Sequence, residues 1–288
     1  MNDYDFSGKT VLVTGGSMGI GEAFARRLAS LGAHLVLVAR GEERLLALAA
    51  ELAPTPVHTI ACDLSEPGAA RRVFEEATRD GRTVDVLVNN AGFAAYGPFE
   101  AVSLEVQRGQ IDVNVGALVE LTHLFLPHLE RQQGGVIHVA STAAFQPVPY
   151  MAVYGATKAF VLSFSEALWA EYRSRGVRVV ALCPGATDTP FFARAGEAAA
   201  FGTKARAEDV VELGLRAFRR NRASVIHGAG NRLTAMLSRL VSREVTAKIS
   251  ARLMAPAARL GAAKTGGALG GDATPRGTGD RSRAPVVP

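Results

Sequence analysis

Short runs of apolar, β-branched residues alternate with longer amphipathic segments through most of this chain. The strand-like runs are Thr10–Thr14, His34–Ala39, Val57–Ala61, Asp85–Asn89, Gly135–Ala140 and Val177–Cys183, with a weaker one at Ser224–His227. The amphipathic segments include Glu22–Leu31, Glu42–Leu52 and Ala69–Arg79. Strands that are apolar almost throughout are buried on both faces, as in parallel sheets covered by helices. The pattern predicts an α/β fold with a doubly wound, Rossmann-like parallel sheet, in which ligands bind at the carboxyl ends of the strands.

Composition divides the chain into three parts. Residues 1–230 carry the alternation and are expected to form a single Rossmann-like domain. Residues 231–260 are expected to form an amphipathic helical extension, because apolar residues recur there at helical spacing, at Leu233, Met236, Leu237, Leu240, Val241, Val245, Ile249 and Leu253. Residues 261–288 are rich in Gly, Ala, Pro and Arg without periodicity, and we expect this tail to be disordered.

Charge and cysteine content narrow the classes of function. The net charge is +5, but its late arginines lack interleaved aromatic residues, so nucleic-acid binding is not expected. No apolar run approaches the length of a membrane span, and the acidic start is not typical of a secretory signal. Cys62 and Cys183 form no Cys-x-x-Cys motif, which fits free thiols in the cytoplasm. His123 and His128 do not share a helix face, so we expect no metal site.

A glycine-rich turn, Gly15-Gly16-Ser17-Met18-Gly19-Ile20-Gly21, joins the first strand to the first helix. Its glycines allow a tight turn, close approach of a pyrophosphate and close packing of helix on strand. The helix N-terminus adds free N–H groups and a partial positive charge. The spacing is Gly-x-x-x-Gly-x-Gly and not the commoner G-x-G-x-x-G. We expect the phosphates of a dinucleotide to contact Gly15, Ser17, Met18, Gly19, Ile20 and Gly21.

The same turn also matches G-x-S-x-G, the nucleophile elbow of serine hydrolases, in the required strand–turn–helix setting. Such a hydrolase needs an acid and a histidine after later strands. The only late histidine is His227, and no clear acidic partner precedes it. A serine hydrolase that uses Ser17 therefore stays as an alternative function.

Arg40 directly follows the second predicted strand. Sites selective for NAD place an acidic residue at this position to bond the ribose 2′-hydroxyl, whereas an arginine accommodates a 2′-phosphate. A surface arginine that opens a helix is the alternative interpretation. Together with the glycine-rich turn, Arg40 favours NADP(H) as the cofactor.

Tyr154 and Lys158 are four residues apart in a segment expected to be helical, so their side chains share one face. A free tyrosine has a pKa of about 10 and exchanges protons poorly at neutral pH. A neighbouring cation favours the phenolate and lowers that pKa, which makes the phenol a usable acid and base. Such pairs also occur by chance on helix surfaces, so this one gains meaning only from the rest of the chain.

Taken together, these motifs resemble the short-chain dehydrogenase/reductase family. In chain order they are Thr14-Gly15-x-x-x-Gly19-Ile20-Gly21, Asp63, Asn89-Asn90-Ala91-Gly92, Asn114, Ser141, Tyr154-x-x-x-Lys158 and Pro184-Gly185. Ser141 precedes Tyr154 by 13 residues, a spacing typical of that family. The resemblance covers about residues 6–230. Gly109 is a departure, since it interrupts the helix expected before Asn114.

The resemblance implies an NADP(H)-dependent oxidoreductase with four catalytic residues. Tyr154 would exchange a proton with the carbonyl oxygen, and Lys158 would lower the pKa of Tyr154 and bind the nicotinamide ribose. Ser141 would polarise the carbonyl, and Asn114 would hold a water that links Lys158 to solvent. The nicotinamide would supply the hydride.

The resemblance also implies the remaining cofactor contacts. These are Asp63 and Leu64 beside the adenine, Asn90, Ala91 and Gly92 along the adenosine ribose, and Pro184, Gly185, Thr187 and Thr189 over the nicotinamide. Asn89 would instead tie neighbouring strands together.

Three loops, 93–99, 142–151 and 189–203, are expected to form the substrate pocket. They supply mainly apolar side chains, namely Phe93, Tyr96, Phe145, Val148, Met151, Phe191, Phe192 and Phe201. Such walls favour an apolar ketone or a 3-oxoacyl substrate, or the corresponding alcohol. A catalytically silent NADP-binding protein remains a second alternative, against which the complete catalytic set argues.

Two partner surfaces are predicted. In the family, the helix that carries Tyr154 and the long helix before it, at about 104–131, pack against a partner subunit. An apolar face on the earlier helix is consistent with a homo-oligomer, and comprises Leu118, Leu121, Leu124, Phe125 and Leu129. The arginine-rich helix within 231–260 could attract an acyl carrier or an anionic membrane surface.

Overall fold

The computed structural model describes residues 4–192, 203–238 and 240–255. These residues belong to one compact unit that ends at Ala255. The predicted tail, 261–288, and the predicted pocket residue Phe201 lie outside the described residues. Among the helices that are described, none is long and apolar enough to span a membrane.

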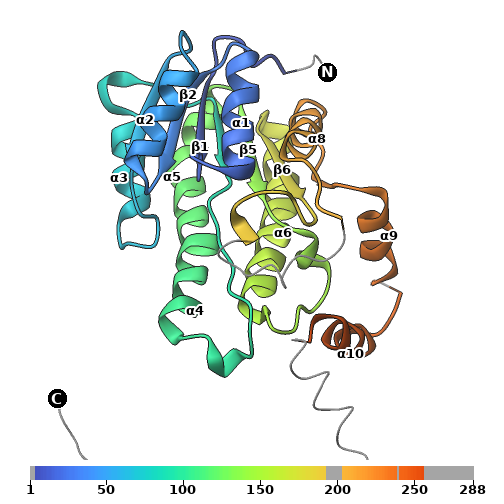
Figure 1. Ribbon diagram of the computed structural model, residues 1–288. Coiled ribbons are helices and arrows are strands. Elements are labelled where there is room, and N and C mark those ends of the chain that lie inside the picture. Colours follow the sequence, from blue (N-terminus) through green and yellow to red (C-terminus); the bar gives the residue numbers. More distant parts are fainter. Residues whose placement is uncertain (1–3, 193–202, 239, 256–288) are drawn as a thin grey trace, which may run out of the picture. The chain divides into compact units, whose positions relative to one another are not determined.

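The centre of the fold is a seven-stranded sheet in which every neighbouring pair is parallel. The strand order is β3-β2-β1-β4-β5-β6-β7, as in a doubly wound fold (Figure 1). The strands are β1 Thr10–Thr14, β2 His34–Ala39, β3 Val57–Ala61, β4 Val86–Asn89, β5 Gly135–Val139, β6 Arg178–Cys183 and β7 Ser224–Ile226. Every predicted strand is therefore confirmed to within one residue at each end.

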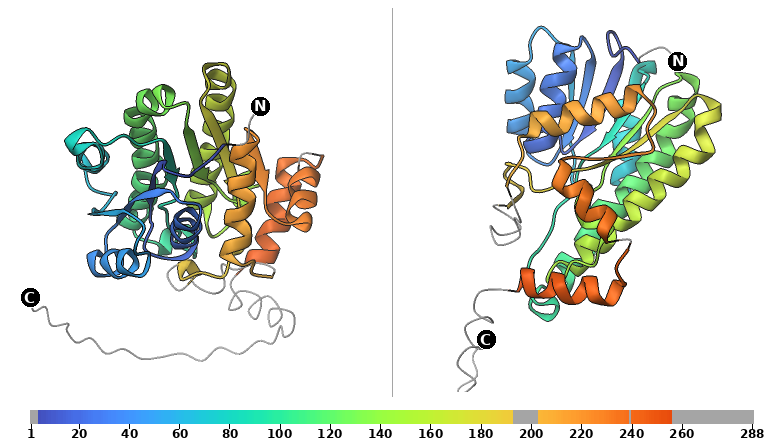
Figure 2. Two further views of the ribbon diagram at one scale, coloured as in Figure 1. Left: turned by 90° about the horizontal axis from the view of Figure 1, so that it is seen from above. Right: turned by 90° about the vertical axis from the view of Figure 1, so that its right-hand side faces the viewer.

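Helices cover both faces of this sheet, as Figure 2 shows. They are α1 Gly19–Ser30, α2 Glu42–Glu51, α3 Ala69–Ala77, α4 Leu104–Ile111, α5 Leu118–Arg131, α6 Ala152–Tyr172, α8 Ala207–Arg219, α9 Ala229–Leu237 and α10 Arg243–Met254. Helices α1, α2 and α8 share one apolar core with the sheet, and α3 and α5 share the other. Successive side chains of a strand point to opposite faces of the sheet. In β2, Leu35 and Leu37 therefore enter the first core, while Val36 and Val38 enter the second.

The apolar face predicted to bind a partner subunit through α5 is instead part of the core. Leu121, Phe125 and Leu129 are at most 1% exposed, and Leu118 is also buried. The first three pack beneath the sheet with residues of β4 and β6. The prediction was wrong because periodicity identifies a buried face without identifying what buries it.

The long helix predicted at about 104–131 is interrupted, but not at Gly109. A π-helical segment at Asp112–Ala117 separates α4 from α5, and Asn114 lies within it. Gly109 itself is helical, and a Cβ there would lie 3.3 Å from the Phe93 ring. Gly109 therefore makes room for Phe93, and the irregularity falls where Asn114 is placed. Segments of this kind often occur at functional sites.

Candidate active site

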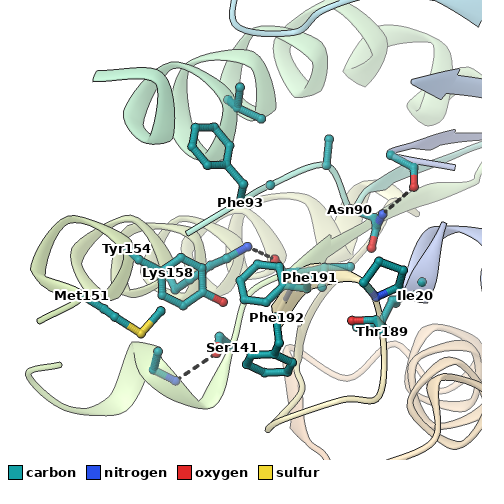
Figure 3. A pocket seen from close by; sticks show the side chains of 18 of the residues that line it. Ile20, Asn90, Phe93, Ser141, Met151, Tyr154, Lys158, Thr189, Phe191 and Phe192 are labelled. Atoms are coloured by element: carbon teal, nitrogen blue, oxygen red, sulfur yellow. Dashed lines mark hydrogen bonds between the residues drawn. The ribbon is translucent and has the colours of Figure 1, made fainter. Parts of the chain in front are cut away.

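A large cavity of about 1630 Å³ opens at the carboxyl ends of the strands. Ordinary ligand pockets measure about 300–1,000 Å³, so this one has room for a dinucleotide together with a substrate. Almost all predicted site residues line it, namely Gly15, Ser17, Met18, Gly19, Ile20, Arg40, Asp63, Leu64, Asn90, Ala91, Gly92, Ser141, Tyr154, Lys158, Pro184, Gly185, Thr187 and Thr189. Figure 3 shows how several of these side chains converge on one space.

Two predicted site residues do not line the cavity. Gly21 lies behind the glycine-rich turn, where a Cβ would come within 2.1 Å of the Gly15 carbonyl oxygen. It therefore allows α1 to pack on the turn and does not face the cavity. Asn114 is 1% exposed and is buried behind the cavity wall.

The glycine-rich turn places the N-terminus of α1 at the cavity. Met18 is extended and α1 begins at Gly19, whose φ of +58° is a conformation that residues with a Cβ rarely adopt. The side chain of Thr189 lies directly against Gly19, so the loop after β6 meets the turn here. This geometry leaves the first N–H groups of a helix facing the cavity, which is an anion-binding arrangement.

Hydrogen bonds to Thr14 join the ends of β1 and β4 beneath this turn. The Thr14 hydroxyl accepts from the backbone N–H groups of Asn90 and Ala91, each at 3.0 Å. The Asn90 side chain donates to the Thr14 carbonyl oxygen at 2.9 Å. Asn90 thus performs the strand-joining role that was predicted for Asn89, while Asn89 donates to Thr122 of α5.

The Asn114 side chain connects two walls of the site. Its Nδ2 donates to the Phe93 carbonyl oxygen at 3.0 Å and to Thr157 Oγ1 at 3.1 Å, and its Oδ1 accepts from the Phe93 N–H. Thr157 in turn donates to the Tyr154 carbonyl oxygen at 2.7 Å. The amide is therefore engaged in positioning the loop after β4 against the helix of Tyr154. The predicted water-holding role of Asn114 stays a prediction.

The pKa of Tyr154 shifts opposite to the predicted direction. Burial raises the pKa of the phenol to about 12, and a hydrogen bond with Ser141 lowers it only in part. The Lys158 ammonium lies 5.8 Å from the centre of the Tyr154 ring and donates to the Val139 carbonyl oxygen at 2.7 Å. The cation thus points at β5 and not at the phenol oxygen, so desolvation of Tyr154 dominates.

Lys158 is itself 5% exposed. Burial lowers the pKa of its ammonium to about 8, although the nearby Cys183 opposes this shift. Perturbed proton carriers in a cavity are a common sign of a reaction centre. Tyr154 and Lys158 therefore form a buried pair whose protonation the surrounding protein controls.

At the other end of the cavity, two arginines follow β2. Arg40 lies 3.7 Å from the Asp63 carboxylate, and both side chains are partly exposed. Burial raises the pKa of Asp63, but hydrogen bonds from Ser65 and the neighbouring Arg40 offset this and hold the pKa below its ordinary value. Arg44 also lines the cavity and was not predicted. Its position one helical turn after Arg40 was the available signal.

An apolar cluster surrounds Tyr154 on the substrate side. It is formed by Ala94, Val148, Met151, Phe192 and Met254, with Tyr96, Ala143, Tyr150, Tyr154, Ala186 and Phe191 packed against it. The predicted residues Phe93, Val148, Met151, Phe191 and Phe192 line the cavity, whereas Tyr96 and Phe145 do not. The rings of Tyr154 and Phe191 lie 5.8 Å apart (Figure 3).

The C-terminal helix α10 supplies part of the cavity wall, which the sequence did not predict. Ser250, Leu253 and Met254 line the cavity. The Tyr96 hydroxyl donates to the Met254 carbonyl oxygen at 2.6 Å, and Met254 packs into the apolar cluster. Helical periodicity in 231–260 indicated an amphipathic helix but not which part of the protein the helix packs against.

The structure gives no support to a hydrolase at Ser17. No histidine lines the cavity among the residues that the structure describes, so Ser17 lacks a general base there. Within the same residues, no group of three or more His, Cys, Asp or Glu side chains could hold a metal ion.

Comparisons with known proteins agree with this geometry. The family model described as short chain dehydrogenase matches residues 9–200. Sulfoacetaldehyde reductase 2 from Chromohalobacter salexigens is 40% identical over 215 residues, covering 70% of this chain and 85% of that protein.

Two solved structures show the likeness in three dimensions. A short-chain dehydrogenase from Sphingobium yanoikuyae in complex with NADPH is 35% identical, with a TM-score of 0.72 over 81% of this chain and 94% of that one. A short-chain dehydrogenase/reductase from Burkholderia phymatum in complex with NAD is 27% identical, with a TM-score of 0.74 and the same coverage. Structures similar to this chain thus hold either nicotinamide cofactor.

Proposed function

This chain belongs to the short-chain dehydrogenase family of oxidoreductases, and we propose that it uses NADP(H) to interconvert an apolar ketone and its secondary alcohol. The observation that carries the proposal is the placement of Tyr154. Its hydroxyl lies beside Ser141 and within an apolar cluster, at the inner end of a cavity whose other end carries Arg40 and Arg44.

The residues present fit a nicotinamide dinucleotide. The turn at Gly19 and the N-terminus of α1 would hold its pyrophosphate, and Arg40 with Arg44 would hold a 2′-phosphate. The loop after β6 meets the turn at Gly19 through Thr189, so Thr187 and Thr189 would contact the nicotinamide half where it joins the pyrophosphate. When bound, this group supplies the hydride that a ketone carbon accepts.

The side chains of the protein then donate a proton and a hydrogen bond to the carbonyl oxygen. In reduction, the Tyr154 hydroxyl donates a proton to that oxygen, and Ser141 donates a hydrogen bond that stabilises the developing negative charge. Lys158 carries the positive charge that favours the tyrosinate after the proton has left. Asn114 acts as a positioning residue, because its amide fixes the helix of Tyr154 relative to the loop of Phe93.

The substrate proposal depends on the cluster around Tyr154. Val148, Met151, Phe192 and Met254 are all less than 10% exposed, so they present apolar surface to a substrate placed at Tyr154. A charged substrate group would lose its hydration there without gaining a partner. The charged residues that line the cavity on α4 and just after it, Glu105, Arg108 and Asp112, are not members of this apolar cluster.

A panel of carbonyl compounds tests this proposal. We expect kcat/KM with NADPH to be about 10- to 200-fold higher for a bulky apolar ketone than for sulfoacetaldehyde, the charged substrate in the name of one relative. Met254→Ala should change the order of preference among apolar ketones by size. Met236→Ala is the matched control, since Met236 is 66% exposed and lies outside the cavity. Fastest turnover on sulfoacetaldehyde would disprove the apolar substrate class.

The burial of Lys158 predicts a pH profile for ketone reduction. Its ammonium titrates at about 8 instead of 10.5, whereas Tyr154, with a pKa of about 12, keeps its proton throughout the assay range. Since only protonated Lys158 supplies the cation, kcat/KM should be flat at acid pH and fall about tenfold per unit above that pKa. Lys158→Arg cannot lose its charge and should flatten the profile. The same descending limb in both proteins would assign the titration to another group.

A homo-oligomer also remains part of the proposal, on different residues. Ile111 of α4 and Phe160 of α6 are exposed apolar side chains on the two helices that the family resemblance indicated.

A further inference from the structure

The two C-terminal helices carry apolar side chains on their outward faces. Large apolar residues between 41% and 83% exposed follow one another along this segment, at Leu233, Met236, Leu237, Leu240, Val241, Val245, Ile249 and Leu253. We call these residues the C-terminal apolar surface. An ordinary surface helix turns its apolar stripe to the core and its polar residues to water. Here the inward stripe is narrow, with Ala235 on α9 and Ser250 and Met254 on α10, and the outward stripe is apolar.

The charged residues beside this surface are almost all basic. The segment 229–255 contains Arg232, Arg239, Arg243, Lys248 and Arg252, and its only acidic residue is Glu244. Glu244 is paired with Lys248 at 2.6 Å. Among the residues that the structure describes, Arg232, Arg243 and Arg252 are exposed and have no acidic partner. Apolar side chains flanked by unpaired cations are typical of helices that lie in the interface of an anionic membrane.

The rim of the cavity continues this surface. Leu253 on α10 is 71% exposed and lines the cavity, and Leu104 at the start of α4 is 70% exposed and also lines it. Both α10 and the start of α4 lie at the same end of the molecule (Figures 1 and 2). Glu105 of α4 lines the cavity and is exposed, and Glu100 just before α4 is also exposed, so the basic contact belongs to α9 and α10.

Charge decides between the possible occupants of this surface. In a symmetric dimer, a second copy would bring the same arginines against one another, and like charges that meet at an interface cost free energy. A small acidic carrier protein would satisfy the arginines, but the apolar side chains extend over both helices and the segment between them. An anionic bilayer satisfies both features at once.

We propose that α9 and α10 dock this protein on an anionic lipid surface, with the mouth of the cavity facing the bilayer. The apolar side chains enter the boundary between headgroups and acyl chains, and the arginines contact lipid phosphates. The docking does not depend on the proposed reaction. The further consequence, that an apolar ketone enters the cavity from the bilayer, rests on the proposed function.

Vesicle flotation of the full-length protein tests the docking without cofactor or substrate. We expect binding to vesicles that contain phosphatidylglycerol, much weaker binding to pure phosphatidylcholine, and loss of binding as salt rises from about 0.1 M to about 1 M. Replacing Arg232, Arg243 and Arg252 together by Gln should weaken binding about 100-fold, since each basic side chain near an anionic surface contributes about a fivefold factor. Replacing Leu233, Met236 and Leu237 together by Gln should weaken binding to both kinds of vesicle.

Two controls make the result specific. Leu46→Gln changes an exposed leucine of α2, and Arg71→Gln an exposed arginine of α3; neither should alter binding. Unchanged thermal unfolding and unchanged turnover of a water-soluble ketone would show that the variants are folded. Failure of the wild-type protein to bind anionic vesicles would overturn the proposal. So would binding that the arginine variant retains, or a dimer in sedimentation that the leucine and methionine variant converts to monomer without any vesicle binding.

Discussion

Tyr154→Phe should lower kcat for ketone reduction by about 10²- to 10⁴-fold, the range that a positioned general acid contributes. The phenylalanine keeps the ring in the apolar cluster with Val148, Met151 and Phe191, so the wall of the cavity should be unchanged. Only the hydroxyl beside Ser141 is lost. The dissociation constant for NADPH, measured by fluorescence titration, should stay within a few-fold of wild type, because binding does not need the transferable proton.

Tyr150→Phe is the matched control for this experiment. Tyr150 packs against the same apolar cluster, lies with its ring tilted by 48° to that of Tyr96, and does not line the cavity. Removal of its hydroxyl should leave kcat nearly unchanged. Full activity in Tyr154→Phe would remove Tyr154 from the mechanism. Tight NADPH binding by a wild-type protein that turns over no carbonyl compound would instead support the catalytically silent alternative.

The fold could be predicted from sequence because its strands are buried on both faces. Val11, Leu12 and Val13 are all fully buried. Val11 and Val13 face one core and Leu12 faces the other, so the run is apolar without interruption. Such runs have sharp ends, where the first polar or glycine residue leaves the sheet. Helix α5 was harder to interpret, since the buried residues of its apolar stripe could belong to the core or to a subunit interface. Periodicity alone does not distinguish the two.

The candidate site was predictable where a backbone requirement fixes a residue type. Gly19 has a positive φ and Gly21 has no room for a Cβ. Glycine is therefore required at both positions, and the turn can be recognised from the sequence. The contribution of α10 was not predictable, because Met254 reaches the cavity through a long-range contact with Tyr96. Its local sequence specifies a helix and nothing of where the helix packs.

The pKa of Tyr154 shows a different limit. Spacing placed Lys158 on the same helix face, but the direction of its ammonium depends on the Val139 carbonyl oxygen of β5. Desolvation then outweighs the attraction between a cation and a phenolate. The balance of these two effects follows from burial, which two residues four apart in a sequence do not reveal.

Arg40→Asp should reverse the proposed preference for NADPH. The wild-type Arg40–Asp63 contact is long, at 3.7 Å, and partly exposed, so it contributes only about 0–1 kcal/mol. A 2′-phosphate offers Arg40 a charge-assisted hydrogen bond worth about 1.5–3 kcal/mol. Arg40 should therefore bind the phosphate in preference to the Asp63 carboxylate. Aspartate removes that bond and adds a like charge, while it can accept a hydrogen bond from a ribose 2′-hydroxyl. The ratio of kcat/KM for NADPH to that for NADH should therefore fall about 100-fold or more.

Steady-state kinetics with both cofactors and one ketone measures this ratio. Two further variants serve as comparisons. Arg44→Gln should lower the ratio by a smaller factor, because Arg40 remains. Arg71→Asp makes the same change of charge on an exposed arginine that does not line the cavity, and should leave the ratio unchanged. If Arg40→Asp keeps the wild-type ratio, the 2′-phosphate is not held at the end of β2. The proposal of NADP(H), which rests on Arg40, would then be withdrawn.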